Sequence, residues 1–292
     1  MIEPLSEGVG DRVKRDYSPN MKRARALLVA IAPLIVVACE DQEKKKAELI
    51  AKTAPSAEPK AATTEVPTTA PAASSAALAV KPKKECGEGP EVTVDDPDLA
   101  AAIRVKLDKK TDAGAGPGTF TTKELASITS LNVTNKASLD ELDPCVFPKL
   151  VNLRFLYLPK GSYRDLSPIA NLTKLEALRA SISEVEDLRP LEKLVMLDQL
   201  DLGRTHVRDI SVLANLVNLT ELALDDTQVS DISPLAKLTK LEQLSIKNTL
   251  VQDVSPLRDL KKLRLLNVSG TALTNLDVLE PLRARGLRIQ TK

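Results

Sequence analysis

A 22-residue repeat of aliphatic residues runs through the second half of the chain and limits its fold more than any other feature. One Leu position recurs every 22 residues, and a second Leu follows three residues after each. The next aliphatic position comes two residues later, so the pattern alternates as a short, half-buried strand does. The paired positions are Leu153/Leu156, Leu175/Leu178, Leu197/Leu200, Leu219/Leu222, Leu241/Leu244 and Leu263/Leu266.

The remainder of each repeat changes from a spacing of two residues to a spacing of three, which is typical of helical turns. Ser-Pro pairs lie at this change, at 167–168, 233–234 and 255–256. Because Ser caps helices and Pro fits the first helical position, we expect each Ser to be the N-cap of a short helix or 3₁₀ turn. One such unit cannot bury its aliphatic side chains alone, so the units should stack into a solenoid.

The repeats begin at Ile128, and a closing strand is expected at Leu287–Ile289, which gives about seven units. The strings TQVSDISPL at 227–235 and LTKL at 238–241 resemble the repeats of internalin-type bacterial leucine-rich repeat proteins. The resemblance implies an α/β leucine-rich repeat solenoid over residues 128–292, with a curved parallel sheet. It also implies a protein-binding role, although it does not imply adhesion to a host cell.

One repeat position departs from that family, which often has Asn where the strand ends and its turn begins. This chain has Gly161, Ser183, Thr205, Thr227, Thr249 and Thr271 there. A hydroxyl bonds the turn backbone more weakly than an Asn side chain does, so turn geometry is expected to differ.

Residues 86–127 are expected to form a small helical N-terminal cap, because a repeat stack needs a polar cover at its end. Asp96-Pro97 has the residue types of a helix start, and Leu99, Ile103 and Leu107 follow at helical spacing. Thr121-x-x-Glu124 matches a capping box for a second helix.

The N-terminal region predicts export. A basic stretch at 21–25 precedes thirteen apolar residues, which are too few to span a membrane but suit a secretory signal peptide. The sequence Val36-Val37-Ala38-Cys39 resembles the bacterial lipoprotein lipobox, which implies that Cys39 is lipidated and that residues 21–38 are the signal peptide. Residues 1–20 are then an upstream extension; the alternative is an uncleaved signal anchor with a chance Cys.

The lipobox resemblance has three further implications. Residues 39–85, rich in Ala, Pro, Thr and Lys, are expected to be a disordered tether that holds the folded part away from the membrane. The chain should be lipid-anchored in the bacterial cell envelope, on the inner or the outer membrane, with its domain in the periplasm or at the cell surface. Since exported domains form disulfides, the remaining Cys86 and Cys145 are expected to pair; a metal pair is disfavoured because no His lies nearby.

Composition argues against several classes of function. The 41 basic residues are balanced by 40 acidic ones, aromatic residues are 2%, and Trp is absent, so no nucleic-acid partner is expected. The single His, His206, excludes mechanisms that need two histidines. We therefore expect no catalytic residues, no metal site and no cofactor.

The residues between the buried strand positions should point to the concave face of the sheet and bind a partner. They are Phe155, Tyr157, Arg179, Gln199, Asp201, Glu221, Gln243, Ser245 and Asn267. Phe155 and Tyr157 are the most informative, since exposed aromatics anchor interfaces; the alternative is that they pack on the cap.

The sequence thus predicts a non-catalytic envelope lipoprotein that binds an unidentified protein through its repeats. One alternative is a structural lipoprotein that spaces envelope layers. Another is an adhesin-like surface protein that binds polysaccharide or a host protein. Indifference to substitutions on the concave face would favour the structural role.

Overall fold

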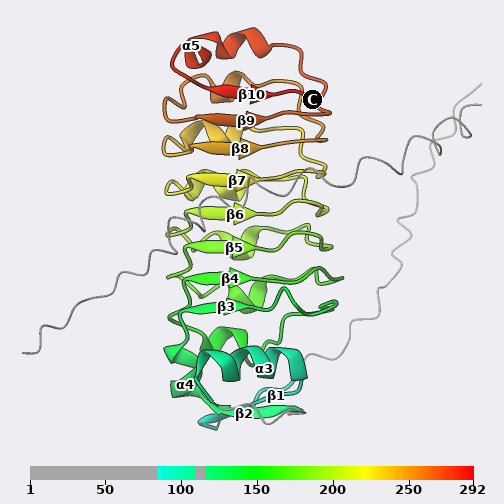
Figure 1. Ribbon diagram of the computed structural model, residues 1–292, viewed down its shortest axis with the longest axis vertical. Coiled ribbons are helices and arrows are strands. Elements are labelled where there is room, and N and C mark those ends of the chain that lie inside the picture. The colour runs from blue at the N-terminus through cyan, green and yellow to red at the C-terminus, as the bar shows by residue number, and fades with distance from the viewer. Residues whose placement is uncertain (1–83, 88, 110–115) are drawn as a thin grey trace, which may run out of the picture. The chain divides into compact units, whose positions relative to one another are not determined.

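The computed structural model describes residues 84–87, 89–109 and 116–292, which form a cap followed by a stack of repeats (Figure 1). Residues 1–20, the signal peptide at 21–38, the lipidation site Cys39 and all of the tether before Lys84 lie outside the described residues. In the part of the chain that the structure describes, no helix is long and apolar enough to cross a membrane.

Eight parallel strands, one from each repeat and one that closes the stack, form a single sheet in chain order. Each strand has three residues, and in all but the last the middle one is buried. The register places these middle residues side by side, from Leu131 to Ile289. The strands are β3 (Ser130–Asn132), β4 (Phe155–Tyr157), β5 (Ala177–Arg179), β6 (Gln199–Asp201), β7 (Glu221–Ala223), β8 (Gln243–Ser245), β9 (Leu265–Asn267) and β10 (Arg288–Gln290).

A row of 3₁₀ helices runs along the other side of the stack. They are η1 (Phe147–Lys149), η2 (Ser167–Ile169), η3 (Arg189–Leu191), η4 (Ser211–Asn215), η5 (Ser233–Lys237), η6 (Ser255–Leu257) and η7 (Leu276–Leu279). Between this row and the sheet, the aliphatic positions of successive repeats form one core, which continues into the cap. The internal repeat therefore predicted both the architecture and the buried residues.

The prediction that Ser is the N-cap of these helices is wrong, because Ser lies one residue too late in the chain. Ser233 is the first helical residue, and the preceding Ile232 is the N-cap, without a side-chain capping bond. The backbone N–H of Ser233 instead donates to Asp231 Oδ1 at 2.7 Å, and Asp165, Asp187, Asp209 and Asp253 accept in the same way in other repeats. A carboxylate two residues upstream thus recurs from η2 to η6, where it satisfies the backbone donor of the first helical residue.

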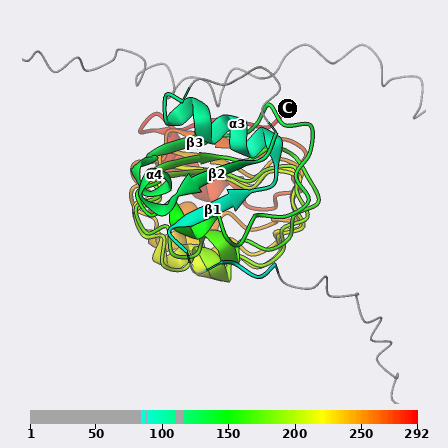
Figure 2. The ribbon, with the colours of Figure 1, turned by 90° about the horizontal axis from the view of Figure 1, so that it is seen from below.

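The cap contains the two expected helices, α3 (Pro97–Lys106) and α4 (Thr122–Ser127). Asp96 caps α3, and Thr121 with Glu124 forms the expected capping box at α4. The cap also contains a feature that we did not predict, since β1 (Glu91–Val94) pairs antiparallel with β2 (Gly118–Thr121). These strands and α3 lie across the end of the stack (Figure 2), so the cap is a mixed rather than a purely helical layer. At the other end lies α5 (Glu280–Arg283).

The expected disulfide joins Cys86 and Cys145, with an S–S distance of 2.04 Å. Beside it, the ammonium of Lys84 bonds Asp95 at 2.6 Å and Asp143 at 2.8 Å. The start of the described chain is therefore joined to the loop before η1 by the disulfide and the Lys84–Asp143 ion pair, and to the loop before α3 by the Lys84–Asp95 ion pair.

Candidate binding surface

The strand residues on either side of the buried row point away from the core and form what we call the open face. The register sorts them into two rows. The first runs Ser130, Phe155, Ala177, Gln199, Glu221, Gln243, Leu265, Arg288, and the second runs Asn132, Tyr157, Arg179, Asp201, Ala223, Ser245, Asn267, Gln290. All nine residues predicted to bind a partner lie in these rows and are partly exposed.

Phe155 and Tyr157 lie on the same strand, near the cap end of the open face, and both are half-buried. The guanidinium of Arg154 lies 5.6 Å from the centre of the Phe155 ring. Two hydrogen bonds, of 2.7 and 2.9 Å, hold that guanidinium to the carboxylate of Glu176. Burial raises the pKa of Tyr157, so its hydroxyl remains a donor at neutral pH. The Phe155 ring thus lies against a guanidinium that is itself held in place before any partner arrives.

The middle of the open face is polar and acidic. Asp201 accepts a hydrogen bond from the Gly203 N–H at 3.0 Å, and its second oxygen lies 3.3 Å from Arg179 Nε. Burial nevertheless raises the pKa of Asp201. In the next repeats, Gln243 donates to Glu221 at 3.3 Å. These groups form a polar strip and not a second apolar patch.

The chain leaves each strand through a tight bend, which we call the corner. Its central residues are Ile182, Arg204, Asp226, Asn248 and Gly270, and all have a positive φ of 52° to 70°. The residue after each bend is the position where we expected hydroxyls to replace Asn. The hydroxyls of Ser183, Thr205, Thr227 and Thr249 are buried and donate to the carbonyl three residues earlier at 2.7 to 2.9 Å. Thr271 differs, because it donates to the Ile246 carbonyl of the preceding repeat.

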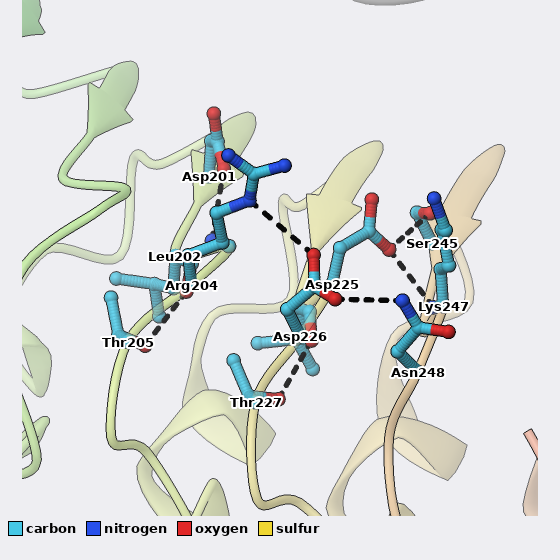
Figure 3. Close-up of polar contacts among 12 residues, drawn as sticks. Asp201, Leu202, Arg204, Thr205, Asp225, Asp226, Thr227, Ser245, Lys247 and Asn248 are labelled. Carbon is cyan, nitrogen blue, oxygen red and sulfur yellow. Dashed lines mark hydrogen bonds and ion pairs between the residues drawn. The ribbon is translucent and has the colours of Figure 1, made fainter. Parts of the chain in front are cut away.

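Side chains link the corners of neighbouring repeats after β6, β7 and β8 (Figure 3). Arg204 Nε lies 3.4 Å from Asp226 Oδ2, and Asn248 Nδ2 donates to Asp226 Oδ1 at 2.7 Å. We call Arg204, Asp226 and Asn248 the corner ladder. Next to it, Asp225 accepts from the Ser245 hydroxyl and from the Lys247 N–H. Sequence analysis missed this ladder, because its members are 22 residues apart and differ in type.

The described residues contain no group of three or more His, Cys, Asp or Glu side chains that could hold a metal ion. His206 lies in an exposed turn, with Nδ1 4.0 Å from Glu186. Neither observation supplies an acid, base or nucleophile arranged for chemistry.

Comparisons with known proteins agree with the geometry. The family model described as leucine-rich repeats in two copies matches residues 217–259. The structure of an internalin C2 from Listeria monocytogenes is 26% identical, with a TM-score of 0.56 over 68% of this chain and 93% of that one. A second internalin from that organism, InlF, is 27% identical, with a TM-score of 0.52 over 67% of this chain and 62% of that one.

A search among curated proteins gives no match. Repeat solenoids use their extended faces to bind other proteins, and this purpose needs no catalytic group. The repeat, the parallel sheet and the two structural matches together show that this chain folds as a leucine-rich repeat solenoid similar to those of the internalins.

Proposed function

We propose that this chain is a membrane-anchored bacterial envelope lipoprotein that binds another protein through the open face and catalyses no reaction. The observation that carries the proposal is the position of Phe155 and Tyr157. They are two of only six Phe and Tyr residues in a chain without Trp, and they lie together on one strand of the open face.

The surroundings of this pair support a binding role. Aromatic residues and Arg are preferred anchors of protein interfaces, because they bury a large area with few flexible bonds. Arg179 lies on the next strand, directly beside Tyr157 in the register. Since Glu176 already holds Arg154 over the Phe155 ring, a partner would lose little side-chain entropy on binding there.

The anchor is proposed from the lipobox ending at Cys39 and from the tether composition. The Cys86–Cys145 disulfide supports it, because such bonds persist in exported proteins and are rare in the reducing cytosol. Labelling with a radioactive fatty acid tests the anchor directly. We expect the label on the wild-type chain and none on Cys39→Ala, which should also leave the membrane fraction. Equal labelling of both would overturn the anchor.

The binding proposal is tested with the full chain, held in a neutral detergent on beads and exposed to envelope extract. The test variant is Phe155→Ser with Tyr157→Ser. The control is Val195→Ser with Met196→Ser, which removes two other side chains that are 46% and 48% exposed away from the open face. We expect a protein that the wild type and the control retain and the test variant loses. Equal retention by all three would refute the open face as the binding surface and favour the structural role.

A further inference from the structure

A cavity of about 310 Å³ lies where the chain leaves β3, β4 and β5. All the charged residues that line it are cations, namely Lys136, Lys160 and Arg179. Two hydroxyl residues, Thr134 and Ser181, and the apolar Ile182 also contribute. The cavity therefore occupies the corner of the first repeats, where the corner ladder would lie if it continued.

The cation best placed for a ligand is Lys160. Its side chain is exposed and makes no hydrogen bond or ion pair with any residue that the structure describes. It lies one repeat before Ile182, so it occupies the corner position that Arg204, Asp226 and Asn248 occupy further along. Lys160 thus brings an uncompensated positive charge to the cavity.

Arg179 is only partly engaged. Its Nε donates to Ser181 Oγ at 3.2 Å and lies 3.3 Å from Asp201. The two terminal nitrogens of its guanidinium form no bond within the described residues, and the side chain is 43% exposed. A guanidinium with both terminal nitrogens available can bind a carboxylate through two parallel bonds.

Lys136 completes the cationic lining and is held by an ion pair with Asp96. Burial lowers the pKa of Lys136, and the nearby Asp140 carboxylate partly opposes that shift. Asp96 pairs with Lys136 and Asp201 lies beside Arg179, while Lys160 forms no ion pair with any carboxylate among the described residues. One unpaired ammonium beside a guanidinium with free terminal nitrogens suits a single carboxylate.

Ile182 gives the cavity an apolar rim, and its backbone is strained there. It has a φ of 59° and is 41% exposed. A β-branched residue rarely adopts this conformation, whereas the equivalent Asn248 and Gly270 adopt it readily. Since Arg204 and Asp226 have nearly the same φ, the repeat imposes this conformation on Ile182 and places its side chain at the rim of the cavity.

We propose that this cavity binds an acidic side chain from a segment of the protein partner. The carboxylate contacts Lys160 and Arg179, while neighbouring apolar groups of the segment contact Ile182 and continue onto Tyr157, which lies beside Arg179 in the register. The assignment rests on the proposed function, since it names the chemistry of a partner that binds the open face.

The test uses the full chain in a neutral detergent with a biotinylated hexaglutamate peptide as the probe. Carbodiimide couples a carboxylate to an amine only in direct contact, so mass spectrometry of the adducts locates the peptide. We expect adducts at Lys160 and Lys136, which about 0.5 M salt suppresses by screening. Adducts spread evenly over exposed lysines such as Lys193 would overturn the site.

Two variants measure the effect on peptide affinity. Lys160→Glu is expected to weaken binding at least about tenfold, whereas Lys193→Glu, a charge reversal of an exposed lysine outside the cavity, should leave it unchanged. Equal affinities for both variants would contradict the proposal. So would competition by inorganic phosphate at far lower concentration than by free glutamate, because the cavity would then be a phosphate site.

The capture experiment separates this inference from the proposed function. If Phe155→Ser/Tyr157→Ser abolishes partner capture and Lys160→Glu leaves it unchanged, the open face binds the partner but the acidic contact is refuted. If Lys160→Glu also reduces capture while Lys193→Glu does not, the acidic contact is supported.

Discussion

The corners after β3, β4 and β5 differ from those after β6, β7 and β8 in their side-chain contacts, and the positive-φ bend begins only at Ile182, after β5. After β6, β7 and β8, the corner ladder joins neighbouring repeats through Arg204, Asp226 and Asn248. After β3, β4 and β5, the equivalent edge is open and lined by cations. From β5 to β9 the backbone bend recurs in each repeat, whereas the side chains that project from it differ.

The small stabilising energy of exposed polar contacts explains why a corner can have the ladder or lack it. Exposed polar pairs contribute little to stability, because water solvates their groups nearly as well when they are apart. The buried hydroxyl beside each bend contributes more, since its loss leaves a backbone carbonyl without a donor. The stack therefore depends on the bend and its buried bond, and a binding cavity can replace the ladder at low cost.

The largest expected effect comes from Gly161, where a side chain cannot be accommodated. A Cβ there would lie 1.7 Å from the Leu139 carbonyl oxygen, and both backbones are joined by hydrogen bonds. We expect Gly161→Ala to lower the free energy of unfolding by about 3 kcal/mol or more. Urea unfolding of the full chain measures it.

The matched control for that prediction is Gly203→Ala. The added Cβ would lie 3.4 Å from its nearest neighbour, Asp201 Oδ1, which is an ordinary contact. Its effect should stay below about 1 kcal/mol. Equal losses of unfolding free energy in the two variants would show that the close approach of the backbones at Gly161 does not make that position special.

The next effect concerns the buried hydroxyl of the later corners. Thr227→Val keeps the shape and branching of the side chain but removes the 2.7 Å bond to the Leu224 carbonyl. We expect a loss of about 1–2 kcal/mol in thermal unfolding. Thr239→Val, at an exposed turn, should change stability by less than about 0.5 kcal/mol. A loss for Thr239→Val as large as that for Thr227→Val would contradict the assigned role.

Ile182→Asn is expected to stabilise the chain by about 1 kcal/mol, because Asn adopts a positive φ more readily than a β-branched residue. The control, Val195→Asn, replaces an apolar residue of similar exposure that lacks a positive φ, and it should bring no gain. Both are compared by thermal unfolding. A destabilised Ile182→Asn would mean that the side chain packs well enough to outweigh its strain.

The corner ladder should contribute least among the contacts compared by unfolding. A double-mutant cycle with Asp226→Ala and Asn248→Ala is expected to give a coupling energy of about 0.5 kcal/mol. A coupling above about 1.5 kcal/mol would show that the later corners need the ladder, and the contrast with the early corners would then be one of stability.

The smallest effect, from Asp201, is a dependence on pH. Since burial raises the pKa of this carboxyl in the folded state, its ionisation opposes folding. Wild-type stability should fall relative to Asp201→Asn as pH rises through the folded pKa, and the two should converge near about pH 3. The Asn oxygen can still accept the Gly203 N–H. An Asn variant that is less stable at pH 7 would mean that the Arg179 pair outweighs burial.

Sequence reasoning located the core because each aliphatic position recurs at a fixed interval, and only stacking buries such a set. It placed the nine open-face residues correctly relative to the sheet for the same reason, while their partner remains a prediction. It missed the antiparallel pairing of β1 with β2, because four-residue strands carry little periodicity and a helix separates them. It assigned the helix N-cap to Ser233 and its equivalents, since Ser-Pro is a familiar helix start. It overlooked Asp231, two residues upstream, whose carboxylate accepts the backbone hydrogen bond.

The cavity could not have been predicted, because its residues come from three repeats and share no motif. Lys136, Lys160 and Arg179 come together only through the register of neighbouring strands. The positive φ of Ile182 is equally hidden, since the sequence suggests such a bend at Asn248 and Gly270 but gives no reason to expect it at Ile.

The disulfide at the start of the described chain determines how the domain responds to force. If the proposed anchor holds the N-terminal side, tension enters at Lys84 and passes through the covalent bond from Cys86 to Cys145, which are 59 residues apart. The cap residues between the two cysteines then carry no load, and tension cannot separate the paired strands β1 and β2 from the repeats. Breaking the bond would let those residues extend by about 200 Å, so the oxidised domain stays short and intact while it is pulled.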